Sequence, residues 1–310
     1  MPRNFVTKLF MTATVAHLMT SAHESTVTIE NVVDELTHEL AAAGILDSRV
    51  DAELLVCHVL QLSRGELAAQ IVLDRTISSS EVANVRGFGQ RRAAREPLQH
   101  ITGHAYFRTL ELAVGPGVFV PRPETELLAG MVVDHVRTLA DPEPLVVDLG
   151  TGSGAIALSV ATEVPHSLVV AVEKSEEAHA WTARNVAAIA PDNTTLVLCD
   201  LADALPEYNG RVSVVVSNPP YIPNDAVPRD PEVRLFDPQL ALYGGSDGLD
   251  VVRILEVTAA RLLRAGGLLA LEHGEFQGPE IAELLRSNGW RAVATHKDLL
   301  GRDRYTTAVR

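Results

Sequence analysis

The sequence predicts an α/β protein in which a mostly parallel sheet follows a small helical bundle. Three observations support this prediction. From Leu145 onward, apolar runs of strand length alternate with segments of helical spacing, the pattern of a parallel sheet covered on both faces. Residues 28–97 show helical spacing alone. A glycine-rich loop, residues 150–154, joins the first predicted strand to a helix, as in sheets that bind ligands at the carboxyl ends of their strands.

Composition places the chain among globular proteins and excludes several other classes. Of the 310 residues, 46% are hydrophobic and 21% charged, so neither a disordered tail nor a fibre is expected. The net charge of −14 disfavours nonspecific binding to nucleic acid. Cys57 and Cys199 form no CxxC pair, and His100 and His104 lack a third ligand at metal spacing, so we expect neither a disulfide framework nor a metal site.

Residues 1–27 are expected to be a poorly determined N-terminal extension. They contain no acid before Glu24 and a mildly apolar run, residues 9–19, as a signal or transit peptide does. Polar residues interrupt that run, and Met11 and Met19 leave room for a later start. No stretch reaches the ~18 uninterrupted apolar residues that a membrane helix needs. We therefore expect a cytoplasmic protein without membrane contact.

Residues 28–97 are expected to form a helical domain. Apolar residues recur at helical spacing in three sets, which begin at Val32, Leu54 and Val82. The third set ends in a basic stretch that contains three arginines. A solvated helix face is the expected role of this stretch, which consists of Arg91, Arg92 and Arg95.

Residues 98–123 are expected to form a hairpin connector. Tyr106–Val114 alternates like a hairpin strand, and the prolines that follow impose an extended backbone. A helix is expected from Glu124 to Leu139. Glu124 and Glu126 either begin this helix at its positive end or reach into a ligand pocket, and both interpretations stay open.

Residues 124–310 are expected to form one α/β domain whose sheet has seven strands. The strands are predicted at Leu145–Leu149, Leu168–Glu173, Leu196–Cys199, Val212–Ser217, Leu268–Glu272, Arg291–Thr295 and Thr306–Val309. The helices between them are predicted at Ala155–Glu163, Glu176–Ala190, Val251–Arg264 and Pro279–Ser287.

The loop after the first strand of this domain carries the first functional motif. It reads Asp-Leu-Gly-Thr-Gly-Ser-Gly over residues 148–154, and its glycines let the backbone pass close to a ligand. Glu173, after the second strand, is placed to bind ribose hydroxyls. The same spacing also satisfies the dinucleotide pattern G-x-G-x-x-G/A, so this loop alone leaves a dinucleotide site open.

The loop after the fourth strand distinguishes the two interpretations. Residues 218–221 read Asn-Pro-Pro-Tyr. The two prolines keep their carbonyls out of a regular ladder, the Asn218 side chain offers an acceptor, and Tyr221 offers a flat face. A planar NH2 group on an sp2 carbon fits there, with its hydrogens on the Asn218 side chain and a proline carbonyl. A dinucleotide dehydrogenase has no use for such a tetrad.

Together these motifs resemble the class I S-adenosylmethionine-dependent methyltransferases that modify amide or exocyclic amino nitrogens. Three further segments resemble the release-factor glutamine methyltransferases (PrmC/HemK) in particular. They are the connector Phe119–Glu126, the segment Leu271–Gly274, and Arg234–Ala241 with the glycines that follow it. The resemblance covers nearly all of residues 30–310 and implies a Rossmann-like methyltransferase domain with a helical N-terminal domain.

The resemblance implies methylation of N5 of the glutamine in the Gly-Gly-Gln motif of class-1 peptide chain release factors. S-adenosyl-L-methionine is the implied cofactor and S-adenosyl-L-homocysteine the product. The implied cofactor-binding residues are Gly150, Thr151, Gly152, Ser153, Gly154, Glu173, Asp200, Leu201 and Asn218. The implied substrate-binding residues are Asn218, Pro219, Pro220 and Tyr221, of which Asn218, Pro219 and Tyr221 are also the catalytic ones. Since one glutamine side chain is a small target, residues 28–97 are expected to dock the release factor.

Two other functions compete with this one. A nucleic-acid amino-methyltransferase uses the same tetrad, but it usually needs a basic groove, and the net charge of −14 argues against direct nucleic-acid binding. A non-catalytic cofactor-binding scaffold has no need of the tetrad.

Overall fold

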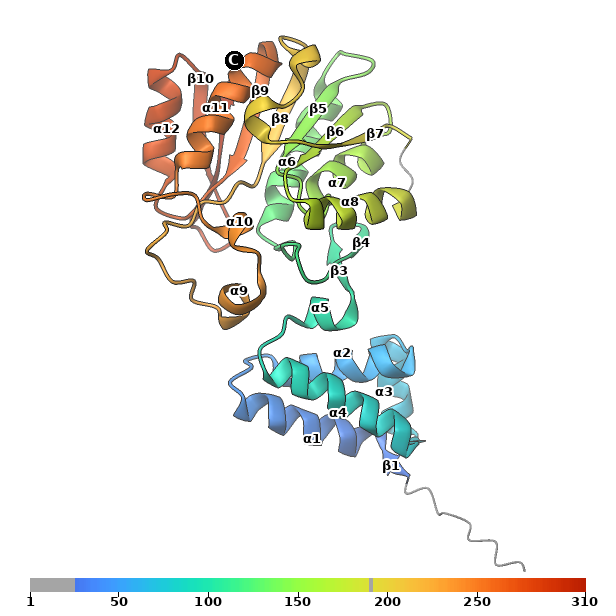
Figure 1. Ribbon diagram of the computed structural model, residues 1–310. Helices are drawn as coiled ribbons and strands as arrows, with labels where there is room; N and C mark the ends of the chain where they lie inside the picture. Colours follow the sequence, from blue (N-terminus) through green and yellow to red (C-terminus); the bar gives the residue numbers. More distant parts are fainter. Residues whose placement is uncertain (1–25, 190–191) are drawn as a thin grey trace, which may run out of the picture.

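The computed structural model describes residues 26–189 and 192–310 (Figure 1). The mildly apolar run at residues 9–19 and the two alternative starts, Met11 and Met19, lie outside these ranges. Within them, no helix combines the length and the apolar character that are needed to cross a membrane.

The N-terminal region is a bundle of four helices around its own apolar core. Ser63 and Ser78 begin two of these helices with capping boxes, in which the serine hydroxyl and a glutamate three residues on satisfy free backbone N–H groups. A two-residue strand before the first helix pairs with another between the third and the fourth. These elements are β1 (Val27–Thr28), α1 (Ile29–Ala42), α2 (Ser48–Leu60), α3 (Arg64–Val72), β2 (Thr76–Ile77) and α4 (Ser79–Ala93).

The connector contains a short helix and a tighter hairpin than the sequence predicts. α5 (Leu98–Thr102) is followed by β3 (His104–Phe107) and β4 (Leu110–Ala113), which pair antiparallel. The single alternating strand predicted through Val114 was wrong because the chain reverses at Arg108, which has a φ of +52°. Glu163 holds the Arg108 guanidinium at 2.6 Å, which stabilises this unusual turn.

The C-terminal region contains the predicted seven-stranded sheet, in the order β10-β11-β9-β8-β5-β6-β7. The strands from β9 to β7 run parallel, and β11 lies antiparallel between β9 and β10. The mostly parallel α/β fold is confirmed. The strands are β5 (Leu145–Leu149), β6 (Leu168–Glu173), β7 (Thr194–Leu198), β8 (Val212–Ser217), β9 (Leu263–Glu272), β10 (Arg291–Lys297) and β11 (Asp303–Val309).

Helices cover both faces of this sheet, and each face has its own core (Figure 1). The apolar residues of α6 (Thr125–Thr138) and α7 (Ala155–Glu163) pack on one face, together with the partly buried residues of α8 (Glu176–Ile189). Those of α11 (Asp250–Leu262) and α12 (Gly278–Ser287) pack on the other. Because both faces are covered, ligands have access at the ends of the strands.

The long segment between β8 and α11 contacts the helical bundle. It contains α9 (Pro231–Phe236) and α10 (Gln239–Leu242). Glu232 of α9 accepts hydrogen bonds from Arg92 at 2.9 Å and from Arg95 at 2.8 Å. Arg92 is only 8% exposed and also pairs with Asp51 at 2.7 Å.

The expected solvated arginine face was therefore wrong for Arg92 and Arg95. Helical spacing alone does not show that a carboxylate 137 positions or more along the chain covers that face. Arg91 pairs instead with nearby Glu96, and its side chain is 44% exposed.

Candidate active site

The carboxyl ends of the central strands surround one cavity of about 920 Å³. The glycine-rich loop after β5 and Glu173 at the end of β6 line one end. The tetrad after β8 and Glu272 at the end of β9 line the other. Its position, where the strand order reverses between β5 and β8, is the usual ligand site of an open α/β sheet.

The glycine-rich loop presents its backbone to the cavity. Gly150 and Gly152 have φ angles of +75° and +59°, a region that side chains strongly disfavour. A Cβ atom on either residue would meet no protein atom within 4 Å, so the space in front of both glycines is open to a ligand. Thr151 and Ser153 line the cavity as well.

Glu173 is buried and fixes the loop. Its carboxylate accepts hydrogen bonds from the backbone N–H groups of Gly152, Lys174 and Ser175, each at 2.8 Å. A carboxylate has about four acceptor sites, so these three bonds leave one for a hydroxyl donor. The carboxylate lies in the cavity wall.

Two of the expected cofactor residues lie outside the cavity wall. Gly154 begins α7, and a Cβ there would press on Thr182 at 3.0 Å, so this glycine is required for packing. Asp200 pairs with Lys174 at 2.7 Å and caps the turn that starts at Leu201. Leu201 does line the cavity. The ion pair with Lys174 is invisible in the sequence, because the two residues follow neighbouring strands.

Asp148 stabilises the glycine-rich loop from a buried position in the sheet. It is 1% exposed, and one carboxylate oxygen accepts hydrogen bonds from the Thr151 hydroxyl at 2.6 Å and from the Ala157 N–H at 3.1 Å. Burial raises the pKa of Asp148 to about 7. The loop is thus held by a buried acid and not by its glycines alone.

The backbone of the Asn-Pro-Pro-Tyr tetrad is braced at both ends. Ser217, directly before it, donates to the Leu149 carbonyl at 2.6 Å. At the other end the Tyr221 carbonyl accepts from the Gln277 side chain at 3.0 Å. Burial raises the pKa of Tyr221 to about 12, so its ring stays a neutral, flat surface. Asn218, Pro219, Pro220 and Tyr221 all line the cavity.

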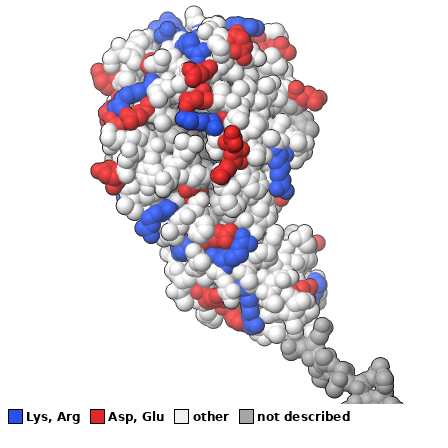
Figure 2. Space-filling view, viewed as in Figure 1, with Lys and Arg blue, Asp and Glu red and all other residues white. Residues whose placement is uncertain are grey.

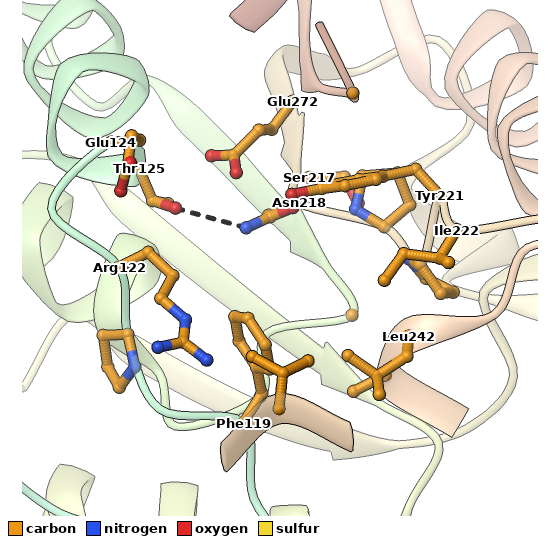
Figure 3. A pocket seen from close by; sticks show the side chains of 18 of the residues that line it. Phe119, Arg122, Glu124, Thr125, Ser217, Asn218, Tyr221, Ile222, Leu242 and Glu272 are labelled. Carbon is orange, nitrogen blue, oxygen red and sulfur yellow. Dashed lines mark hydrogen bonds between the residues drawn. The ribbon is translucent and has the colours of Figure 1, made fainter. Parts of the chain in front are cut away.

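The Asn218 side chain has a defined orientation. Its NH2 group donates to the Thr125 hydroxyl at 3.2 Å (Figure 3). The amide oxygen is therefore left as an acceptor for a ligand. No donor among residues 26–189 and 192–310 bonds the Pro219 carbonyl. These two free acceptors belong to one residue and the next, and an NH2 group has two hydrogens to donate.

Glu272 is a cavity residue that the sequence did not single out as part of the site. It ends β9, is 2% exposed, and burial raises its pKa to about 7. Its oxygen Oε2 is buried with no hydrogen-bond partner in the described part of the chain. The available signal was an acid directly after an apolar strand, the same pattern that identified Glu173.

The structure separates the roles of the two glutamates that begin α6. Glu124 lines the cavity and lies 3.5 Å from the guanidinium of Arg302. Glu126 accepts a hydrogen bond from the Arg108 N–H at 2.9 Å and so stabilises the hairpin. Phe119 and Arg122 of the connector also line the cavity, and Arg122 pairs with buried Asp237 at 2.8 Å.

This fold and this cavity define a class I S-adenosylmethionine-dependent methyltransferase that acts on a planar nitrogen. Two family models match the chain: the PrmC N-terminal domain at residues 31–103 and the methyltransferase small domain at residues 112–237. A release factor glutamine methyltransferase of Streptomyces coelicolor is 49% identical over 89% of this chain and 96% of that protein. The chain belongs to the PrmC/HemK release factor glutamine methyltransferase family.

Two further relatives show how wide the similarity extends. A release factor glutamine methyltransferase of Bifidobacterium longum is 41% identical over 91% of this chain and 99% of that protein. A 4-amino-L-phenylalanine/4-methylamino-L-phenylalanine methyltransferase of Streptomyces pristinaespiralis is 38% identical over 91% of this chain and 95% of that protein. Proteins with this architecture therefore include one named for an aromatic amine, and the substrate has to be argued from the site.

Proposed function

We propose that this enzyme methylates N5 of the glutamine in the Gly-Gly-Gln motif of class-1 peptide chain release factors. The observation that carries the proposal is the pair of free acceptors, the Asn218 amide oxygen and the Pro219 carbonyl, beside the flat ring of Tyr221. A primary carboxamide offers two N–H donors in one plane, which matches this pair. The names of the relatives from Streptomyces coelicolor and Bifidobacterium longum agree with this substrate.

The residues at the other end of the cavity fit S-adenosylmethionine, which supplies a methyl group on a sulfonium. Gly150, Thr151, Gly152 and Ser153 would hold it through the backbone, and Glu173 would accept its ribose hydroxyls. Leu201 would pack against the adenine. The open space in front of Gly150 and Gly152 is the observation that supports this fit.

The tetrad would overcome the low nucleophilicity of the amide nitrogen. The nitrogen lone pair is delocalised into the carbonyl, and accepting both N–H hydrogens favours a pyramidal nitrogen with a localised pair. That pair forms the new N–C bond to the methyl while the C–S bond breaks and its electrons return to sulfur. The N-methylated amide then loses one proton to solvent. Alignment of the reacting groups contributes up to ~7–11 kcal/mol of the barrier reduction.

The rim of the cavity favours a protein substrate over a free amino acid. Val227, Leu240 and Phe276 line it and are 68%, 54% and 84% exposed. Exposed apolar residues grouped at a cavity mouth are typical of a protein-binding surface. We propose that the helical domain, residues 28–97, supplies the rest of the docking surface, since specific complexes usually bury about 1,200–2,000 Å².

Surface charge disfavours the nucleic-acid alternative. The face shown in Figure 2 mixes basic and acidic side chains and shows no continuous basic groove. A release factor acts in translation, so we place the enzyme in the cytoplasm.

The test is methyl transfer from labelled S-adenosylmethionine to an intact class-1 release factor, followed by tandem mass spectrometry of the modified peptide. We expect one methyl on the glutamine of Gly-Gly-Gln and none on a release factor in which that glutamine is asparagine. 4-Amino-L-phenylalanine and a single-stranded oligonucleotide serve as competing substrates. Preferential methylation of either one would reject the proposal.

A further inference from the structure

Glu272 and Asn218 lie side by side at the carboxyl edge of the sheet. Ser217 of β8 pairs with Leu271 of β9, so the next residue of each parallel strand reaches the same edge. Thr125, which begins α6, lies between them and the connector (Figure 3). All three line the cavity, and Thr125 and Glu272 are 4% and 2% exposed. A buried carboxylate here requires a role, because burial without a charged partner is costly.

We propose that Glu272, acting through Thr125, holds the Asn218 amide in the orientation that methyl transfer needs. Glu272 is thus a positioning residue and not a group that attacks or protonates the substrate. This inference rests on the proposed function, in which the Asn218 oxygen accepts a hydrogen of the glutamine amide.

The direction of the hydrogen bonds carries the inference. A carboxylate only accepts, and a threonine hydroxyl has a single hydrogen. The Glu272 carboxylate points toward the Thr125 hydroxyl and the Asn218 side chain (Figure 3), and interaction with both side chains opposes the rise of its pKa. Once the Thr125 hydrogen is committed to Glu272, the hydroxyl oxygen faces Asn218 as an acceptor, and it receives the Asn218 NH2 group at 3.2 Å. The Asn218 oxygen then points to the substrate.

Without the Glu272 carboxylate, nothing fixes which way the hydrogen bond between Thr125 and Asn218 runs. The Thr125 hydroxyl is free to donate to the Asn218 oxygen, and the side-chain amide can turn by half a rotation. Asn218 then presents its NH2 group to the NH2 group of the substrate, where two donors face each other. The side chain remains in place, but the acceptor that the reaction uses is gone.

The charge of Glu272 matters for the same reason, because a protonated carboxyl can donate. Burial raises the pKa of Glu272 to about 7; among the neighbouring charges, Arg304 of β11 lowers this pKa and Glu124 raises it. Tyr221 faces the same space and stays neutral. The neighbouring His273 points away, since its ring bonds Thr306 and the Gly274 carbonyl at 2.9 Å. We expect kcat to fall as the pH decreases through about 7.

The test compares Glu272→Gln with Glu256→Gln, a matched control at another buried glutamate, which bonds Trp290 at 2.6 Å on the far side of the sheet. For Glu272→Gln we expect kcat on the intact release factor to fall about 100-fold, the usual effect of misplacing one active-site group. We expect KM for the release factor and the affinity for S-adenosylhomocysteine to stay near wild type. For Glu256→Gln we expect normal kcat.

Thermal stability separates positioning from a structural role. Because the folded-state pKa of Glu272 is raised, its charge destabilises the folded protein at pH 8, and Glu272→Gln removes that charge. We therefore expect Tm at pH 8 to be unchanged or higher for Glu272→Gln and lower for Glu256→Gln. Thr125→Ser keeps the hydroxyl and should retain most of kcat, whereas Thr125→Val should lose it as Glu272→Gln does.

Each outcome either supports or overturns the positioning role of Glu272. Loss of kcat with normal stability, together with rescue by Thr125→Ser and loss of the pH dependence near 7 in Glu272→Gln, supports the inference. Normal kcat in Glu272→Gln, or a loss of kcat in parallel with a lower Tm, overturns the inference alone. Failure of the wild-type enzyme to methylate the release factor overturns the proposed function and this inference with it.

Discussion

The two ends of the cavity are built differently. At the proposed cofactor end, the cavity is lined by one continuous loop, residues 150–153, which is held by Glu173 and Asp148. At the substrate end, the proposed contacts come from the Asn218 side chain and the Pro219 carbonyl, and Asn218 is oriented by Thr125, 93 positions away in the chain. A backbone site tolerates side-chain variation and binds a constant ligand. A site that depends on one oriented side chain is sensitive to single substitutions, and we propose that the specificity for a planar nitrogen lies there.

The largest effect is expected at the substrate end. Asn218→Ala removes the acceptor for the amide, and loss of one positioned hydrogen-bonding group in a dry site costs about 10²–10³-fold in rate. We expect this loss in kcat, measured by single-turnover methyl transfer, with cofactor affinity unchanged by calorimetry. Asn224→Ala, at an exposed asparagine in the segment that follows, is the matched control. Near wild-type turnover by Asn218→Ala would show that Asn218 does not act on the substrate, and it would contradict the division of the cavity into two ends.

At the cofactor end we expect a smaller effect, on the affinity for S-adenosylmethionine and not on kcat. Glu173→Ala removes the acceptor for the ribose and the anchor of the Gly152 N–H. Hydrogen bonds to charged groups contribute roughly 1.5–3 kcal/mol, so the affinity for S-adenosylmethionine should fall about 10–100-fold. Glu176→Ala, at the exposed start of α8, should bind normally. Unchanged affinity in the calorimeter would remove Glu173 from the site.

Substitutions at two glycines of the same loop should change different quantities, the cofactor affinity at Gly152 and the free energy of unfolding at Gly154. Gly152→Ala places a methyl into open space in front of the loop, so it should weaken cofactor binding about tenfold and cost only the ~1 kcal/mol of a strained backbone. Gly154→Ala presses on Thr182 and Leu158 and should chiefly lower the free energy of unfolding, by about 1–3 kcal/mol. Urea unfolding and calorimetry measure both quantities. If Gly152→Ala bound the cofactor normally, the loop would not be the cofactor cradle.

The smallest effect is expected where the helical bundle meets α9. Glu232→Ala leaves Arg92 paired with Asp51 and should cost about 1 kcal/mol of stability, as for a partly exposed ion pair. We expect KM for the intact release factor to rise a few-fold, about 5-fold at this energy, with kcat on a short Gly-Gly-Gln peptide unchanged. An equal loss on both substrates would mean that α9 shapes the pocket and not the docking surface.

The comparison of the two ends also explains what the sequence predicts. The glycine-rich loop, Glu173 and the tetrad are each continuous segments at strand ends, so strand periodicity and turn residues were sufficient to identify them. Glu272 was found only in the structure, because its proximity to Asn218 follows from the pairing of β8 with β9. Strand pairing is a tertiary property that local patterns do not encode.

The same limit accounts for the wrong expectations. Arg92 and Arg95 were expected in solvent because their partner, Glu232, lies in another domain. Asp200 was expected at the adenine because it directly precedes Leu201; in the structure it pairs with Lys174, and its role toward the cofactor stays a prediction. The hairpin turn at Arg108 depends on Glu126 and Glu163, which are also distant in sequence. In each case a charged side chain has a long-range partner that composition and spacing do not reveal.

Single-turnover methyl transfer by Asn218→Ala and Glu173→Ala across a titration of S-adenosylmethionine tests the separation of the two ends most directly. Intact release factor is the substrate, and the methylated glutamine is quantified by mass spectrometry. The account predicts that Glu173→Ala recovers most of the wild-type rate once the cofactor is saturating, while Asn218→Ala stays slow at every concentration. Recovery of both variants, or of neither, would contradict the division of the cavity into a cofactor end and a substrate end.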